Sequence, residues 1–143
     1  MRIIGLDIGS KTIGVAVSDA LGITAQGLTT IQWDENNLKS ADEPIKKIIK
    51  QYDVQKAVIG LPKHMNGTIG ERGEASKRYA AHLEKVHHIP TEFWDERLTT
   101  IAAERVLLEA DMSRKKRRKV IDKMAAVMIL QGYLDQSNKG VTR

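Results

Sequence analysis

Cysteine is absent from this 143-residue chain. Without thiols the protein has no disulfide, no thiolate zinc site, no iron–sulfur cluster and no cysteine nucleophile. A metal bound here must therefore use oxygen or histidine ligands. The same composition fits a reducing compartment, so we expect a cytoplasmic protein.

Aromatic residues and long apolar runs are also scarce. One Phe, three Tyr and two Trp are too few for the stacking platform on which single-strand binding proteins hold bases. The longest apolar run, residues 124–130, is far shorter than the ~20 residues that span a bilayer. The N-terminus lacks a cationic segment followed by a long apolar stretch, so we expect neither a membrane anchor nor a secretory signal.

The remaining composition is that of an ordinary globular domain. Hydrophobic residues make up 41% of the chain and charged residues 29%, which argues against global disorder and fibrous repeats. A chain of this length suits one domain with a substantial core. We expect that domain over residues 1–136, followed by a frayed tail over residues 137–143.

Positive charge is concentrated in one place. The formal net charge is +5, and one run of six consecutive cations contains no acid. Its members are Arg114, Lys115, Lys116, Arg117, Arg118 and Lys119. Such a run is a common electrostatic footprint for a polyanion such as nucleic acid. The alternative is a solvated first turn of a helix.

Hydrophobic periodicity predicts strands and helices in an order typical of α/β proteins. Strands are expected at 2–8, 12–18, 23–32, 56–61 and 91–94. Helices are expected at 38–52, at 72–87, from Thr99 or Thr100 to Glu109, and from Ser113 to about Gln136. Because Pro44 removes a backbone donor, the regular part of the first helix should begin near Glu43. This order predicts a mixed sheet with helices on both faces, in which ligands bind beyond the carboxyl ends of the parallel strands.

Acidic residues stand at the ends of two predicted strands. Asp7 lies at the end of the first strand, and Asp95 and Glu96 follow the last. If the two strands are parallel neighbours, these carboxylates lie at the same edge of the sheet. The local alternatives are that Asp7 hydrogen-bonds its own turn and that the acidic pair binds Arg97.

A third acid, Asp122, lies in the last predicted helix. Ala125 and Ala126 follow it at helical spacings of three and four, so this helix face has little bulk and can approach the sheet closely. A carboxylate on that face is costly to bury unless it pairs with a cation or binds a metal. The alternative places Asp122 at the solvent boundary, paired with Arg118 or Lys119.

Convergence of the three acids would make a cluster of oxygen ligands without His or Cys. Such a cluster suits a hard cation, Mg²⁺ or Mn²⁺, rather than zinc. Carboxylates within ~4 Å of one another either take up protons or recruit divalent ions. Two ions ~3.5–4 Å apart can activate water and clamp a phosphodiester for in-line displacement. The adjoining basic run would then supply counter-charge for the nucleic-acid backbone.

The segment 60–70 closes the fourth predicted strand with a glycine-rich loop. It either exposes backbone donors, Lys63 or His64 to a phosphate or is an ordinary flexible connection. The pattern GxxxxGK[ST] does not occur, which disfavours a P-loop nucleotide site. The histidines lack the spacing of metal ligands and are expected at the surface. They are His64, His82, His87 and His88.

Four segments together resemble one known family. They are DIGSKTIGVAVSD (7–19), GLPKHMNGTIG (60–70), DERLTT (95–100) and IDKMAAVMILQGYL (121–134). In this order and at these separations they are similar, over nearly the whole chain, to the YqgF family, also called RuvX. Members of that family are described as Holliday junction resolvases and as nucleases that process the 5′ end of pre-16S ribosomal RNA. The opening pattern also resembles the phosphate loop of the actin and sugar-kinase superfamily.

The resemblance implies a ribonuclease H-like α/β fold whose mixed sheet has the strand order 3-2-1-4-5, with strand 2 antiparallel. It also implies a metal-dependent phosphodiesterase site with three acidic ligands. By the match of motifs these are Asp7, Glu96 or its neighbour Asp95, and Asp122. We choose Glu96 as the second metal ligand because its longer side chain can reach inward from beyond the strand end.

The same match assigns cations to the site. Lys11 corresponds to a basic position next to the first acid; many family members have Arg after it, whereas this chain has Thr12. We expect Lys11, Lys63, Arg97 and the 114–119 run to bind phosphates, with water as the nucleophile.

The prediction is therefore a Mg²⁺- or Mn²⁺-dependent endonuclease that acts on structured nucleic acid, with the precursor of 16S rRNA ahead of a four-way DNA junction. One alternative is a non-catalytic assembly factor, whose nucleic-acid affinity would depend steeply on salt. Another is an actin-like ATP-binding domain, which the size disfavours because that class clamps nucleotide between two such domains. No heptad or exposed apolar face predicts a dimer, so we expect a monomer or a weak homodimer.

Overall fold

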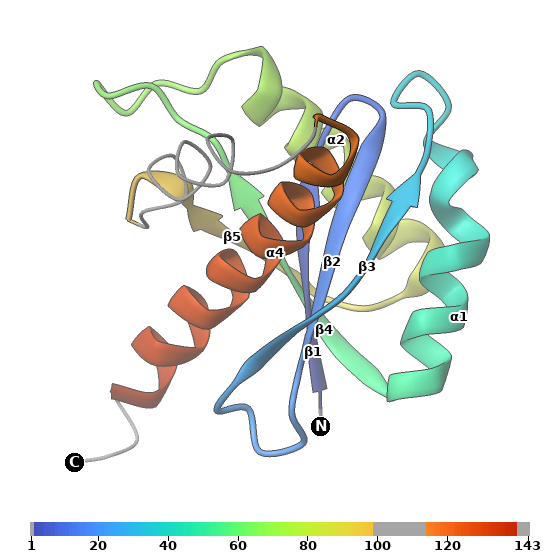
Figure 1. Ribbon diagram of the computed structural model, residues 1–143, viewed down its shortest axis with the longest axis vertical. Coiled ribbons are helices and arrows are strands. Elements are labelled where there is room, and N and C mark those ends of the chain that lie inside the picture. Colours follow the sequence, from blue (N-terminus) through green and yellow to red (C-terminus); the bar gives the residue numbers. More distant parts are fainter. Residues whose placement is uncertain (1, 99–113, 140–143) are drawn as a thin grey trace.

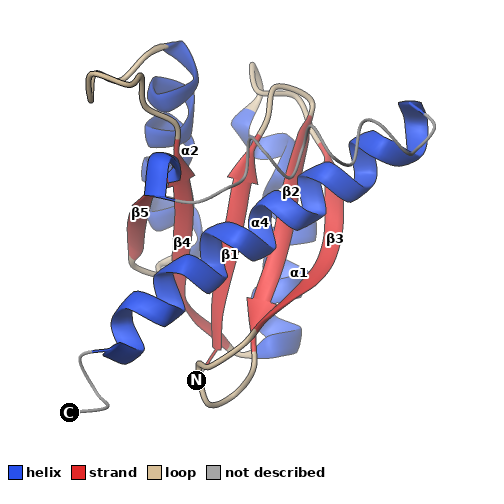
Figure 2. Ribbon diagram, turned by 60° about the vertical axis from the view of Figure 1, so that its left-hand side comes forward, coloured by secondary structure: helices blue, strands red, loops and turns tan. Residues whose placement is uncertain are grey.

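The computed structural model describes residues 2–98 and 114–139, and its centre is a five-stranded sheet. The strands are β1 (Arg2–Ile8), β2 (Thr12–Ser18), β3 (Ala25–Gln32), β4 (Val54–Leu61) and β5 (Thr91–Asp95). They lie in the order β3-β2-β1-β4-β5, visible from right to left in Figure 2. The strand β2 is antiparallel to both of its neighbours, whereas β1, β4 and β5 are parallel. The predicted mixed sheet and its strand order are confirmed.

Helices connect and cover these strands. They are the short 3-10 turns η1 (Leu38–Ala41) and η2 (Glu96–Leu98), and the helices α1 (Asp42–Tyr52), α2 (Glu71–His87) and α4 (Arg114–Lys139). As predicted, Pro44 falls in the first turn of α1, where a missing backbone donor breaks no intrahelical bond. The helix predicted from Thr99 or Thr100 to Glu109 lies outside the described residues.

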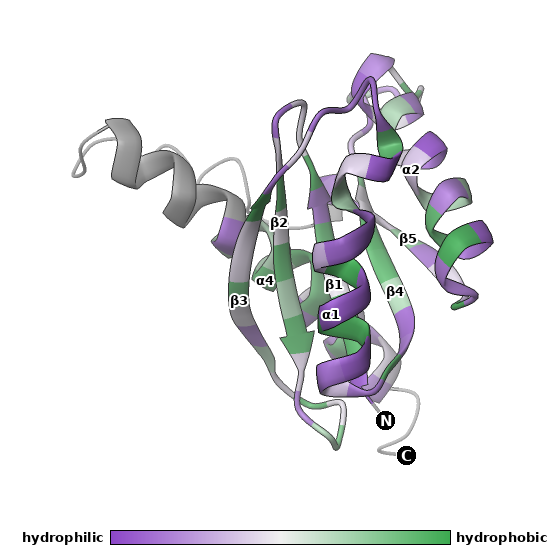
Figure 3. Ribbon diagram, turned by 90° about the vertical axis from the view of Figure 1, so that its right-hand side faces the viewer, coloured by the Kyte–Doolittle hydropathy of each residue, from purple (hydrophilic) through white to green (hydrophobic). Residues whose placement is uncertain are grey.

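One face of the sheet is covered by α1 and α2 (Figure 3). The apolar side of α1 buries Ile45 and Ile48 in a cluster with side chains from β1, β2 and β4. In the same cluster Trp33 and Tyr79 pack edge to face, with ring centroids 5.1 Å apart. Burial of these branched and aromatic side chains is the main driving force for folding on this face.

Among the described helices only α4 covers the other face, and it crosses the strands diagonally (Figures 1 and 2). Small residues let it approach closely: Ala125 and Ala126 are buried, and a Cβ at Gly5 would lie 2.6 Å from the Cβ of Leu130. The predicted close approach of this helix to the sheet is confirmed. A glycine in β1 thus sets the distance between the two layers.

Several boundaries differ from the prediction, and β4 begins at Val54 rather than at residue 56. The strand β3 begins at Ala25 rather than residue 23, because the backbone N–H groups of Ile23 and Thr24 donate to the Asp19 carboxylate at 2.7 and 3.2 Å instead of joining the sheet. The last helix continues to Lys139 rather than ending near Gln136. Residues 137–139, predicted as the start of a tail, are therefore helical, and the Asn138 side chain donates to the carbonyl oxygen of Gly22 at 3.1 Å.

Among the described residues, no helix is both long enough and apolar enough to cross a membrane.

Candidate functional site

Asp7 lies near the carboxyl end of β1 and points to the α4 face. Side chains alternate along a strand, and Gly5, two residues earlier, faces Leu130 of α4. Across the sheet Asp7 pairs with Gly14 of β2, and continuing the Leu6–Ile59 register by one residue places Gly60 of β4 on its other side. The half-buried carboxylate is thus flanked on both neighbouring strands by residues without side chains.

Glu96 reaches the same place from the far side of β4. It is the first residue of η2, directly after β5, and it is also half-buried. A Cβ at Gly60 would lie 3.2 Å from the Glu96 carboxyl carbon. The structure therefore brings Asp7 and Glu96 together over Gly60, at the carboxyl ends of the parallel strands.

The carboxylate of Asp95, the alternative to Glu96 as a ligand, is paired with Arg97. Its carboxylate accepts hydrogen bonds from the Arg97 backbone N–H at 3.0 Å, from Nε at 3.1 Å and from Nη2 at 2.7 Å. The hydrogen bond from Arg97 holds the pKa of Asp95 below its ordinary value. The Nζ of Lys63 lies 3.8 Å away and adds a weaker attraction. The local pairing that the sequence left open is thus the one that Asp95 makes.

The third predicted acid and the basic run belong to α4, but their side chains lie outside the described part of the structure. This holds for Asp122 and for Arg114, Lys115, Lys116, Arg117, Arg118 and Lys119. Within the described residues no group of three or more His, Asp or Glu side chains is placed to hold a metal ion. The described donor set is two half-buried carboxylates that lie beside Gly60, and an all-oxygen set of this kind fits a hard divalent cation.

Lys11 lies at the same edge as Asp7, exposed in the turn between β1 and β2. That turn is held by Trp33, whose backbone N–H donates to the Lys11 carbonyl at 3.0 Å and whose indole donates to the Gly9 carbonyl at 2.9 Å. Two hydrogen bonds from Trp33 therefore fix the turn that carries Lys11, close to Asp7. Lys63 is half-buried beside Asp95 by comparison, and Arg97 is bound to Asp95.

Arg72 also supports this edge, and sequence reasoning missed it. Its Nη2 donates to the Ile8 carbonyl at 3.1 Å, and its Nη1 pairs with Glu35 at 2.7 Å. The bond to Ile8 fixes the backbone directly after Asp7. Nothing in the local sequence signals these contacts, because Arg72 is 64 positions from Ile8 and 37 positions from Glu35.

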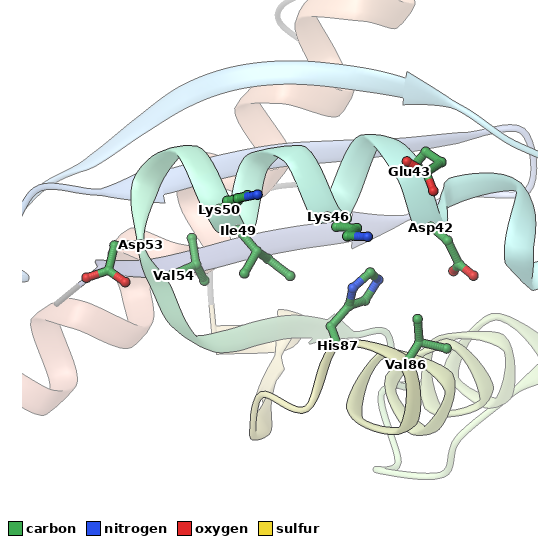
Figure 4. Close-up of a pocket in the computed structure, with 9 residues that line it drawn as sticks. All are labelled: Asp42, Glu43, Lys46, Ile49, Lys50, Asp53, Val54, Val86 and His87. Carbon is green, nitrogen blue, oxygen red and sulfur yellow. The ribbon is translucent and has the colours of Figure 1, made fainter.

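The histidines differ from the prediction that all four lie at the surface. The Nε2 of His82 is 2.7 Å from the Asp42 carboxylate and its side chain is only 14% exposed. His87 projects between α1 and α2 into a cavity of about 640 Å³ lined by charged residues of both signs (Figure 4). His82 and His87 are partly buried because α2 packs against α1. This cavity lies on the opposite face of the sheet from Asp7 and has no part in the acidic site.

Comparisons with known proteins find one matching family and several relatives. Residues 1–136 match the family described as "RuvX: Holliday junction resolvase". A protein of Oceanobacillus iheyensis, named "Putative pre-16S rRNA nuclease", is 78% identical over 136 residues, which are 95% of this chain and 99% of that protein. Proteins of the same name from Listeria monocytogenes and Bacillus cereus are 62% and 58% identical, over 96% and 95% of this chain and 100% and 99% of their own lengths.

Solved structures with little sequence identity share the fold. The RuvC protein of Thermus thermophilus in complex with a Holliday junction substrate superposes with a TM-score of 0.58 at 8% identity, covering 96% of each chain. The Fowlpox virus resolvase in complex with Holliday junction DNA gives a TM-score of 0.57 at 12% identity, covering 95% of this chain and 98% of that one. These likenesses confirm the predicted ribonuclease H-like fold.

Proposed function

The chain belongs to the RuvX family, and from that membership we propose that it is a metal-dependent endonuclease that hydrolyses phosphodiester bonds in structured nucleic acid. We propose the precursor of 16S rRNA as its substrate and maturation of the 5′ end of that RNA as its task. Support comes from the relatives in three genera that carry the name of pre-16S rRNA nuclease, each matched over nearly its full length.

The observation that carries the proposal is the meeting of Asp7 and Glu96 over Gly60. Two partly buried carboxylates that lie close together repel each other unless a proton or a cation lies between them. Glycine at position 60 lets the Glu96 carboxyl group approach the sheet beside Asp7, where the two carboxylates would share such a cation. Asp122 is our proposal for the third ligand, since it belongs to the helix that covers this face.

Each residue would have a defined task. A bound Mg²⁺ or Mn²⁺ would lower the pKa of a water nucleophile and stabilise the departing oxygen. Asp7, Glu96 and Asp122 would hold that cation, and Lys11 would neutralise the phosphate on the exposed side of the site. The basic run 114–119 and Lys63 would bind neighbouring phosphates, which fix the position of the substrate without reading its sequence.

A four-way DNA junction is the second candidate substrate, because the family description names a Holliday junction resolvase. Symmetric cleavage of a junction favours two copies of an enzyme related by a two-fold axis. We propose a monomer or a weak homodimer in the cytoplasm, and this choice favours the RNA substrate.

The proposal is tested by incubating the purified protein with a pre-16S rRNA fragment or a four-way DNA junction, in Mg²⁺, Mn²⁺ or EDTA. The variants are Asp7→Asn and a control, Asp53→Asn, which also removes one carboxylate charge but at an exposed position. Asp53 has a left-handed backbone that Asn tolerates, and it lies at the opposite end of the strands. We expect cleavage that needs the metal, is lost in Asp7→Asn and persists in Asp53→Asn.

Two results would contradict the proposal. Equal cleavage by Asp7→Asn would mean that the activity has another source. If the wild type bound but did not cut either substrate, and Asp7→Asn bound equally well with the same steep salt dependence, the protein would be a non-catalytic assembly factor.

A further inference from the structure

The residues on either side of Glu96 are bonded to each other. The Asp95 Oδ1 accepts the backbone N–H of Arg97, two residues on, at 3.0 Å. A carboxylate that accepts from the backbone two positions later closes an Asx-turn, and the residue enclosed by this turn is Glu96. The backbone of the proposed metal ligand is therefore fixed by its predecessor.

The same Arg97 closes the turn a second time through its side chain. Its Nε donates to both carboxylate oxygens of Asp95 at 3.1 Å and its Nη2 to Oδ2 at 2.7 Å. Pairing of a planar guanidinium with a carboxylate is among the strongest and most directional of side-chain contacts. With these donors on it, Asp95 has little acceptor capacity left for a metal.

A third link joins Arg97 to the loop between β4 and α2. Its Nη1 donates to the carbonyl oxygens of Met65 at 3.3 Å and His64 at 3.5 Å. The loop has internal bonds of its own, from His64 N–H to the Thr68 carbonyl and from Gly67 N–H to the His64 carbonyl, both 2.9 Å. Figure 1 shows this loop on the same end of the sheet as η2. One guanidinium thus ties the loop to the turn that contains Glu96.

We propose that Asp95 and Arg97 are positioning residues: they orient Glu96 for metal binding and hold the loop 62–70 against the same edge of the sheet. This inference rests on the proposed function for the part that concerns the metal. It assigns Asp95 a role other than ligand and Arg97 a role other than phosphate contact. Residues that orient metal ligands typically change metal affinity or activity by about 10–100-fold when lost.

Metal titration without substrate separates a ligand from a positioning residue. The wild type, Asp95→Asn, Asp95→Ala and Glu96→Gln would be titrated with Mn²⁺ alone by isothermal calorimetry. Asn keeps the Oδ1 that closes the turn, so Asp95→Asn should bind Mn²⁺ within about threefold of the wild type, whereas Asp95→Ala should bind about 10-fold or more weakly. Glu96→Gln should bind most weakly of all.

Two outcomes of the titration would overturn the proposal. If Asp95→Asn weakened binding as much as Glu96→Gln, Asp95 would itself be a ligand. If Asp95→Ala bound Mn²⁺ like the wild type, the turn would have no influence on Glu96.

Hydrogen exchange tests the loop without any metal or cleavage. Amide exchange of the segment 62–70 would be followed by mass spectrometry in the wild type, Arg97→Lys, Arg97→Gln and the control Arg78→Gln, which removes an exposed arginine from α2. Lys keeps the charge but not the planar fork, so both Arg97 variants should exchange at least about fivefold faster in this segment, and Arg78→Gln should not. Unchanged exchange in Arg97→Gln would refute the role of Arg97 in the loop.

The two measurements also distinguish this inference from the proposed function. A wild type that binds no divalent cation would overturn the metal-dependent function and, with it, the role of Asp95 toward Glu96. Exchange in the 62–70 segment would still decide whether Arg97 holds the loop.

Discussion

The two faces of the sheet differ in the side chains that β1, β2 and β4 contribute to them. The face under α1 and α2 buries branched and aromatic residues, among them Leu6, Ile59 and Tyr79. The face under α4 also buries Ile3, Val58 and Trp94, but it has glycine at positions 5 and 60 and alanine at position 16, and it bears Asp7. Adjacent residues of β1 thus lie on opposite faces: Leu6 points to the first face and Asp7 to the second.

This difference shows how a small domain can combine stability with a charged site. Large apolar side chains supply most of the free energy of folding, and they fill the space that a ligand would need. Small residues on the other face let α4 lie close to the sheet, and Gly60 lets the side chains of Ile129 and Glu96 lie against β4 beside Asp7. The predictions below test whether stability and activity separate in this way.

The largest expected effect is on activity, from Asp7→Asn on the α4 face. Loss of a charged ligand should lower the cleavage rate by more than about 100-fold, above the range typical of residues that act only through a ligand. The melting temperature should stay the same or rise, because one of two neighbouring carboxylates is gone. Cleavage assays and calorimetry on the same preparation check both parts, and a large drop in melting temperature would contradict the separation.

The next effect is on stability, from Leu6→Ala at the neighbouring position. Leu6 is fully buried, so its truncation should lower the free energy of unfolding by about 2–5 kcal/mol. Urea unfolding measures the loss, and Leu21→Ala, at a side chain that is 80% exposed, is the control that should change little. The Leu6→Ala protein that remains folded should still bind Mn²⁺ normally; weakened binding would mean that the two faces are coupled.

A smaller loss in the free energy of unfolding is expected from Gly5→Ala, which adds a methyl group between β1 and α4. The new methyl group would meet the Leu130 Cβ at 2.6 Å and the Ala126 carbonyl oxygen at 3.1 Å. Neither atom can move without the helix, so we expect a loss of about 1–3 kcal/mol in urea unfolding. Gly27→Ala is the matched control, because its methyl group would meet only the flexible stem of Lys123. Equal losses in the two variants would show that helix distance is not the cause.

The smallest effect concerns pH and the α1/α2 face. Burial lowers the pKa of His87 below its ordinary value of 6.5. The unfolded chain therefore binds more protons than the folded one below about pH 6.5. The contribution of neutral His87 to the free energy of unfolding is complete above that pH and is lost as the pH falls through the pKa of His87 in the folded protein. Urea unfolding at pH 7.5 and 5.5 should show a smaller pH dependence in His87→Gln than in the wild type. Identical pH dependence would contradict the assignment.

The fold was largely predictable because its signals are local. The strands β1 and β2 lie at their predicted residues, since short apolar runs bounded by turn residues mark strands well. The strand order rested on the resemblance to a family rather than on the pattern of residues. The end of α4 was missed because Asn138 is anchored by Gly22, a contact across 116 residues that no local pattern reveals.

The candidate site was predictable in part. The rule that ligands bind at the carboxyl ends of parallel strands predicts that Asp7 and the pair Asp95 and Glu96 lie at one edge of the sheet, as they do. The choice between Asp95 and Glu96 depends on which carboxylate Arg97 binds, and that is decided by the shape of one turn. Burial of His82 and His87 depends on how α2 packs against α1, which sequence spacing does not specify. The roles of Asp7, Glu96 and Asp122 as ligands, and of the run 114–119 as a phosphate-binding segment, remain predictions.

The bonds between α4 and the β2–β3 hairpin imply an order of events during translation. Gln131 accepts the backbone N–H of Ala25 across 106 residues, and Asn138 reaches Gly22 across 116. A nascent chain that has already made every strand still lacks the helix that covers the face bearing Asp7. Contacts of such long range form late, so the face that bears Asp7 stays uncovered by α4 until that helix has left the ribosome and docked.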